Sequence, residues 1–140
     1  MERSKKVKLL QVVLIINALY FLIAAVAHFF GLTIFQMYDR NLYTPYHDTL
    51  LALSDLIFVM IFLTVARDPI KNKDIINTII VAFLLVIFFN IGIIWKIDFT
   101  LLGSSLKRVQ TVIETIGAVI TLILLIFLKS KIQFSKKLKK

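Results

Sequence analysis

The sequence predicts an all-α membrane protein, an antiparallel bundle of four transmembrane helices with both the N- and C-termini in the cytoplasm. Of its 140 residues 59% are hydrophobic, and the mean hydropathy is +0.90, whereas soluble domains are about 45–50% apolar. Four apolar runs each approach the roughly 20 residues that a helix needs to cross a bilayer. They cover residues 7–30, 49–66, 75–95 and 109–128. We expect one four-helix domain, residues 1–128, followed by a basic cytoplasmic tail, residues 129–140.

The first apolar run begins in a cluster of basic residues, an arrangement that also occurs in cleaved signal peptides. The cluster holds Arg3, Lys5, Lys6 and Lys8. A signal peptide, however, has an apolar core of only about 7–15 residues before a small-residue cleavage site. Here the apolar residues continue to Phe30 without such a site, so we predict a retained transmembrane helix.

The remaining runs are continuous and too long for the strands of a membrane barrel, so helices are expected there as well. A short polar turn around Pro69, residues 67–74, joins the second run to the third. This turn predicts that the second and third helices are antiparallel neighbours.

The distribution of lysine and arginine predicts the orientation, because these residues are enriched on the cytoplasmic side of membrane proteins. Four lie in the N-terminal stretch, three in the polar turn and six in the tail, against four in the two other loops. We expect the tail to be poorly ordered and to rest on anionic lipid headgroups, and we expect no nucleic acid partner. The lysines assigned to headgroup contact are Lys5, Lys6, Lys8, Lys136, Lys137, Lys139 and Lys140.

Each apolar run carries one polar residue of interest, and the predicted topology places all four at a similar depth in the outer half of the membrane. They are His28, Asp55, Asn90 and Glu114. Polar and ionisable groups at this depth are costly, so each is a candidate for function. We predict that these four residues form a polar pocket.

This polar layer has four possible roles, one of which is a contact between subunits. Its carboxylates could act as hydrogen-bonded packing groups that pair with His28, Lys96, Lys107 or Arg108, which is the interpretation we favour from sequence. The layer could instead relay protons or hold a polar headgroup. It could also ligate a divalent metal through imidazole and carboxylate, but no ExxH or HExxH spacing supports a metal site.

Two further polar residues, His47 and Asp48, stand at the start of the second apolar run, where a carboxylate complements the helix dipole. We expect them to cap that helix. Cysteine is absent, which excludes disulfides, thiolate metal sites and a cysteine nucleophile. No phosphate-binding glycine loop or Ser/His/Asp arrangement is present, so we predict no cofactor and no catalytic residues.

The second run closes with Ala66-Arg67-Asp68-Pro69, and a short basic turn leads directly into the third run. This segment, the Tyr20-Phe21-Leu22 region and the four-helix profile resemble the small membrane proteins of the DoxX-like and BphX-like families. The resemblance implies a small accessory membrane protein, in some cases associated with redox systems, without a defined catalytic residue set.

The leading functional hypothesis is a non-enzymatic accessory or structural subunit of a larger membrane complex, in the cell membrane. Its partners would be the lipid bilayer and other membrane subunits or a second copy of the chain. The alternative is a small transporter, or a ligand- or proton-binding membrane protein, that uses the polar layer. A membrane-embedded enzyme acting on a lipid or quinone, with His28 and Glu114 as acid and base, ranks third.

Overall fold

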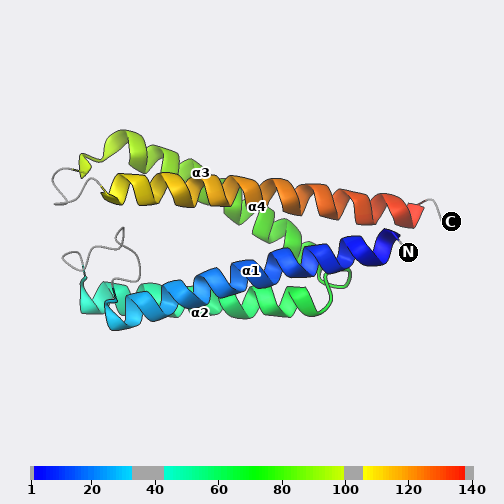
Figure 1. Ribbon diagram of the computed structural model, residues 1–140, viewed down its shortest axis with the longest axis horizontal. Helices are drawn as coiled ribbons and strands as arrows, with labels where there is room; N and C mark the ends of the chain where they lie inside the picture. Colours follow the sequence, from blue (N-terminus) through cyan, green and yellow to red (C-terminus); the bar gives the residue numbers. More distant parts are fainter. Residues whose placement is uncertain (1, 33–42, 100–105, 138–140) are drawn as a thin grey trace.

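The computed structural model describes residues 2–32, 43–99 and 106–137, and within these ranges the chain forms four helices and no strand. The helices are α1 (Glu2–Phe30), α2 (Pro45–Arg67), α3 (Lys73–Lys96) and α4 (Leu106–Lys137), shown in Figure 1. Each one is long and apolar enough to cross a membrane. The prediction of four helices that are long and apolar enough to cross a membrane is therefore confirmed.

The helices extend beyond the apolar runs because polar residues continue them at their ends. The largest extension is in α4, which continues as far as Lys137 and so makes most of the predicted tail helical. Residues 129–137 contain no glycine or proline, and adding residues to an existing helix is much easier than starting one. The prediction of a poorly ordered tail is wrong as far as Lys137, and Lys139 and Lys140 lie outside the described residues.

The connection between α2 and α3 is stabilised by its own side chains. Pro69 disfavours helix at the residue before it, and α2 ends at Arg67. The carboxylate of Asp68 accepts hydrogen bonds from the backbone N–H groups of Ile70 and Lys71, at 3.1 and 3.0 Å. Asn72 donates its side-chain amide to the Asp68 carbonyl at 3.0 Å, directly before α3 begins.

The buried core lies in the half of the molecule where α1 begins and α4 ends (Figure 1). All four helices contribute to it. Its most completely buried side chains are Leu10 and Leu14 from α1, Val65 from α2, Ile76 from α3, and Leu125 and Leu128 from α4. Two polar contacts join helices in the same half: Gln11 donates to the Ala66 carbonyl at 2.9 Å, and Lys129 donates to the side chain of Asn77.

The helices do not pack equally with one another. α1 packs along α2 and also against α4, while α3 packs chiefly against α4. α3 starts near α2, where the rings of Phe62 and Phe83 are 6.3 Å apart, and then crosses away from α2 (Figure 1). The expectation that the second and third helices are close neighbours therefore holds only near their turn, since a short turn fixes the starting point of a helix but not its crossing angle.

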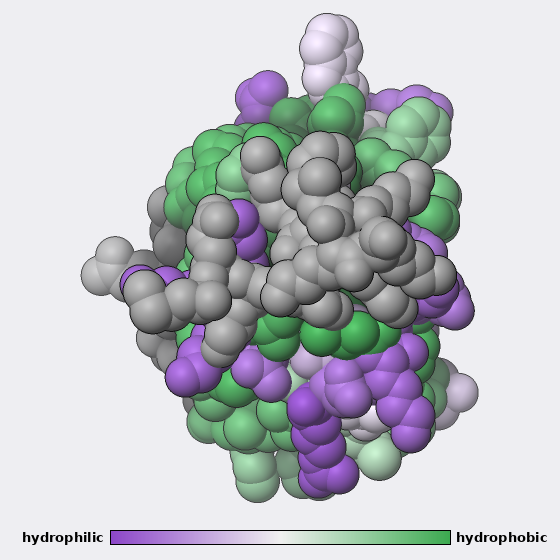
Figure 2. Space-filling view, turned by 90° about the vertical axis from the view of Figure 1, so that its right-hand side faces the viewer, coloured by the Kyte–Doolittle hydropathy of each residue, from purple (hydrophilic) through white to green (hydrophobic). Residues whose placement is uncertain are grey.

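Hydrophilic side chains surround the end of the molecule where α1 begins and α4 ends, and hydrophobic ones cover its flanks (Figure 2). The described cations of this end come from the start of α1, the α2–α3 turn and the last part of α4; they include Lys5, Lys6, Lys8, Lys71, Lys73 and Lys129. We call this end the basic end and the opposite one the cavity end.

Candidate functional site

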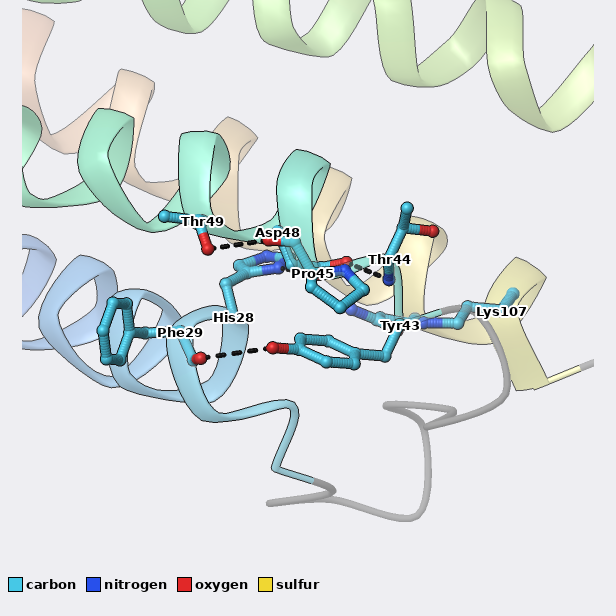
Figure 3. Close-up of polar contacts among 9 residues, drawn as sticks. His28, Phe29, Tyr43, Thr44, Pro45, Asp48, Thr49 and Lys107 are labelled. Atoms are coloured by element: carbon cyan, nitrogen blue, oxygen red, sulfur yellow. Dashed lines mark hydrogen bonds and ion pairs between the residues drawn. The ribbon is translucent and has the colours of Figure 1, made fainter.

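An ion pair joins the last turn of α1 to the first turn of α2 at the cavity end (Figure 3). The Nδ1 atom of His28 lies 2.7 Å from one carboxylate oxygen of Asp48. The other oxygen of Asp48 accepts the backbone N–H of Thr44 at 2.7 Å. Asp48 is 7% exposed, so its charge is stabilised by these partners rather than by water. Of the two residues predicted to cap the second helix, Asp48 does so by accepting the N–H of the N-cap residue Thr44, and the same carboxylate is also the partner of His28. His47 makes no capping hydrogen bond among the described residues.

The end of α1 is fixed by a glycine turn. Gly31 has a φ of +59°, and the backbone N–H of Leu32 bonds to the Ala27 carbonyl at 2.9 Å, the bonding pattern of a Schellman C-cap. The Tyr43 ring packs over Gly31, where a Cβ atom would lie 3.0 Å from it. The Tyr43 hydroxyl donates to the carbonyl of Phe29 at 3.4 Å (Figure 3). Both segments that carry the ion pair are thus held in position.

The first two turns of α4 present a chain of polar side chains on one face. Residues three and four apart lie on the same side of a helix, and here Lys107, Gln110, Thr111 and Glu114 follow that spacing. Gln110 accepts from the Lys107 ammonium at 3.4 Å and donates to the Glu114 carboxylate at 2.9 Å. Gln110 therefore separates the cation from the anion instead of letting them pair directly.

These elements enclose a polar cavity of about 380 Å³. This volume lies within the range of about 300–1,000 Å³ that is usual for small-molecule sites. Its lining comes from α1, α2, α4 and the residues directly before α2. The lining residues are His28, Tyr43, Thr44, His47, Asp48, Leu51, Lys107, Gln110, Thr111 and Glu114. Almost all of them are polar, which is unusual in a chain that is 59% hydrophobic.

Further polar side chains lie next to the cavity on the side of the basic end. Tyr20 is within electrostatic range of Glu114 and Asp55. Asp55 is within electrostatic range of both His28 and Glu114, but no hydrogen-bond donor contacts it among the residues that the structure describes. Tyr20 is 50% exposed, and α2 and α4 do not pack closely against each other.

An aromatic layer follows the polar one toward the basic end. Phe58 and Phe62 lie one and two turns after Asp55 on the same face of α2. The ring of Phe21 stacks on both, with ring centroids 5.0 and 5.6 Å apart. This layer lies between the cavity and the aliphatic core.

Of the four residues predicted to form a pocket, His28 and Glu114 line the cavity. Asp55 is next to them, as its electrostatic interactions indicate. Asn90 does not line the cavity, and neither does any other residue of α3, because α3 packs against α4 and away from α2.

Sequence reasoning missed the contribution of the α2 start and of the residues before it. Thr44, His47 and Leu51 are ordinary interfacial residues in the sequence, and only the fold places them opposite α4. Lys107, Gln110 and Thr111 do follow from the sequence, because they share the helical spacing of Glu114 and form one polar stripe with it. Among the residues that the structure describes, no three His, Asp or Glu side chains are grouped so that they could hold a metal ion.

Comparison with protein-family models, with characterised proteins and with solved structures found no match for this chain. The resemblance to the DoxX-like and BphX-like proteins therefore stays a prediction.

Proposed function

We propose that this chain is a non-enzymatic, multi-pass protein of the cell membrane that binds a small polar ligand in the cavity formed by α1, α2 and α4. The observation that carries the proposal is the polar lining of this cavity. Polar and ionisable groups are expensive within membrane-spanning segments and are usually found there in binding sites, ion pathways or polar contacts between helices. His28 and the Thr44 N–H are the hydrogen-bond partners of Asp48. The polar side chains of α4 on the other side line the cavity.

The proposed orientation places both termini in the cytoplasm and the cavity end at the outer surface, in an antiparallel bundle. Its support is the excess of lysine and arginine in the N-terminal stretch, the α2–α3 turn and the C-terminal stretch. These segments lie together at one end of the molecule (Figure 1). The ligand would then reach the cavity from outside the cell or from the outer leaflet.

Two tryptophan variants of α4 test the binding function. Thr111 lines the cavity, whereas Ile113 is 50% exposed and faces away from it at nearly the same depth. The probes are a panel of small amines, carboxylates, phosphate esters and sugars, and the measurement is the melting temperature of the purified protein in mild detergent. We expect at least one class to stabilise the wild type and Ile113→Trp but not Thr111→Trp. Equal responses of both variants, or no response of the wild type, would contradict the proposal.

A role as accessory subunit is the second candidate, and the structure of α3 favours it. Only 6% of the most apolar stretch of α3 is buried against the other helices. Most of this helix is therefore available to lipid or to a partner helix. Purification of the tagged protein in mild detergent, followed by mass spectrometry, tests this role. A larger partner in fixed stoichiometry supports it, and recovery of the chain alone contradicts it.

A further inference from the structure

Two pairs of cations at the basic end are brought together by contacts between helices. The first pair stands where α1 passes the end of α2. There Gln11 donates to the carbonyl of Ala66 at 2.9 Å. Lys8 stands one turn before Gln11 on the same side of α1, and Arg67 directly follows Ala66. The first pair is therefore Lys8 and Arg67, and both side chains are exposed.

The second pair stands where the start of α3 meets the last part of α4. Lys129 of α4 donates to the side chain of Asn77 on α3. Lys73 is four residues before Asn77, one turn earlier on the same side of α3, and is exposed. Asn77 carries no charge, so it does not neutralise Lys129. A fifth cation, the exposed Lys71, lies in the turn that joins α2 to α3.

The carboxylates of the described residues do not form ion pairs with these cations, which are Lys8, Arg67, Lys71, Lys73 and Lys129. The carboxylate of Asp68 instead accepts the backbone N–H groups of Ile70 and Lys71. Asp74 stands in the first turn of α3, where it complements the positive end of the helix dipole. Like charges that stand close together repel each other, and an anion bound between them relieves this repulsion.

The position of the cations along the helices indicates where this anion comes from. All five lie within one turn of the ends of the apolar spans or in the turn between two spans. This is the depth at which lipid headgroups lie, and long basic side chains near helix ends extend toward them. The anionic lipids of the cytoplasmic leaflet attract such clusters of lysine and arginine.

We propose that the basic end binds the phosphate groups of anionic phospholipids, one beside Lys8 and Arg67 and another beside Lys73 and Lys129. Arginine can donate two parallel hydrogen bonds to one phosphate, and lysine adds a compact charge. The cations of the α2–α3 turn thus join the terminal lysines that the sequence assigns to headgroup contact. This surface lies at the opposite end from the cavity, so the proposal does not depend on the proposed ligand-binding function.

The test measures the binding of phosphatidylglycerol and phosphatidylcholine with identical acyl chains to the full chain, purified in mild detergent, by native mass spectrometry. We expect phosphatidylglycerol to bind at least tenfold more tightly, with a preference that decreases as the salt concentration rises. Arg67→Gln and Lys73→Gln should each weaken its binding about fivefold, which corresponds to about 1 kcal/mol per cation near a membrane surface. Binding of phosphatidylcholine should not change.

Lys96→Gln is the matched control, because Lys96 is an exposed cation at the other end of α3. It should leave both lipids unaffected, and a loss equal to that of Arg67→Gln would overturn the proposal. If Arg67→Gln does not fold, Lys71→Gln replaces it, since the turn uses only the backbone N–H of Lys71. Unchanged phosphatidylglycerol binding in that variant overturns the proposal. Equal binding of the two lipids to the wild type, expected if the cations serve an acidic segment of a partner protein, overturns it too.

Discussion

The basic end and the cavity end are built from the same four helices but are packed in different ways. At the basic end, Leu14, Val65 and Leu125 are completely buried, and all four helices contribute to one aliphatic core. At the cavity end, α3 has moved away from α2, and the space beside α1 is lined by polar side chains. Apolar packing dominates the first end, whereas the second holds polar groups that surround a cavity.

This difference separates stability from binding within one small chain. Lipid is as apolar as leucine, so helices in a membrane associate through close packing and polar contacts. The basic end supplies the close packing, and the small residues Ala25, Ala27 and Ala52 allow α1 and α2 to approach at the cavity end. We therefore expect substitutions at the two ends to have separable effects on unfolding and on ligand binding.

The largest loss of stability is expected from Leu14→Ala, because Leu14 is 0% exposed at the centre of the core. The cavity left behind should lower the free energy of unfolding by about 2–3 kcal/mol, at the lower end of the usual range because lipid also solvates leucine well. Unfolding by sodium dodecyl sulfate in mixed micelles measures this. Leu19→Ala is the control, since Leu19 is 53% exposed on the same helix. Equal effects of both variants would show that the core is not at this end.

Asp48→Ala should come next, with a loss of about 2 kcal/mol, because it removes the partner of His28 and the bond to the Thr44 N–H. His28→Ala leaves the second bond intact and should cost less. The same unfolding measurement on the two single variants and the double variant should give a coupling of about 1 kcal/mol between the residues. Strictly additive losses would mean that the pair does not hold α1 to α2.

A smaller loss, about 1 kcal/mol, is expected from Gly31→Ala, because alanine is strained in the left-handed conformation and its Cβ would lie 3.0 Å from the Tyr43 ring. Gly117→Ala is the matched control. Gly117 is helical with no atoms within 4 Å of a Cβ, so alanine there should stabilise α4 slightly. Thermal unfolding should show a lower melting temperature for Gly31→Ala and a slightly higher one for Gly117→Ala. A change in the same direction for both variants would contradict the role of the Gly31 turn.

The existence and approximate limits of the four helices follow from the sequence, because continuous apolar runs of this length have few other solutions in a bilayer. The arrangement of the helices does not follow from it. Asn90 has the same depth and polarity as its three companions in the predicted pocket, yet α3 carries it away from the cavity. Crossing angles depend on how side chains of two helices interdigitate, which the hydropathy of one helix does not specify.

Asp48 shows the same limit at a single residue. Its position predicts a cap for α2, and it is one. Its second role depends on His28, a residue twenty positions away on another helix. The sequence offers His28 several carboxylates, and only the packing of α1 along α2 selects Asp48 among them.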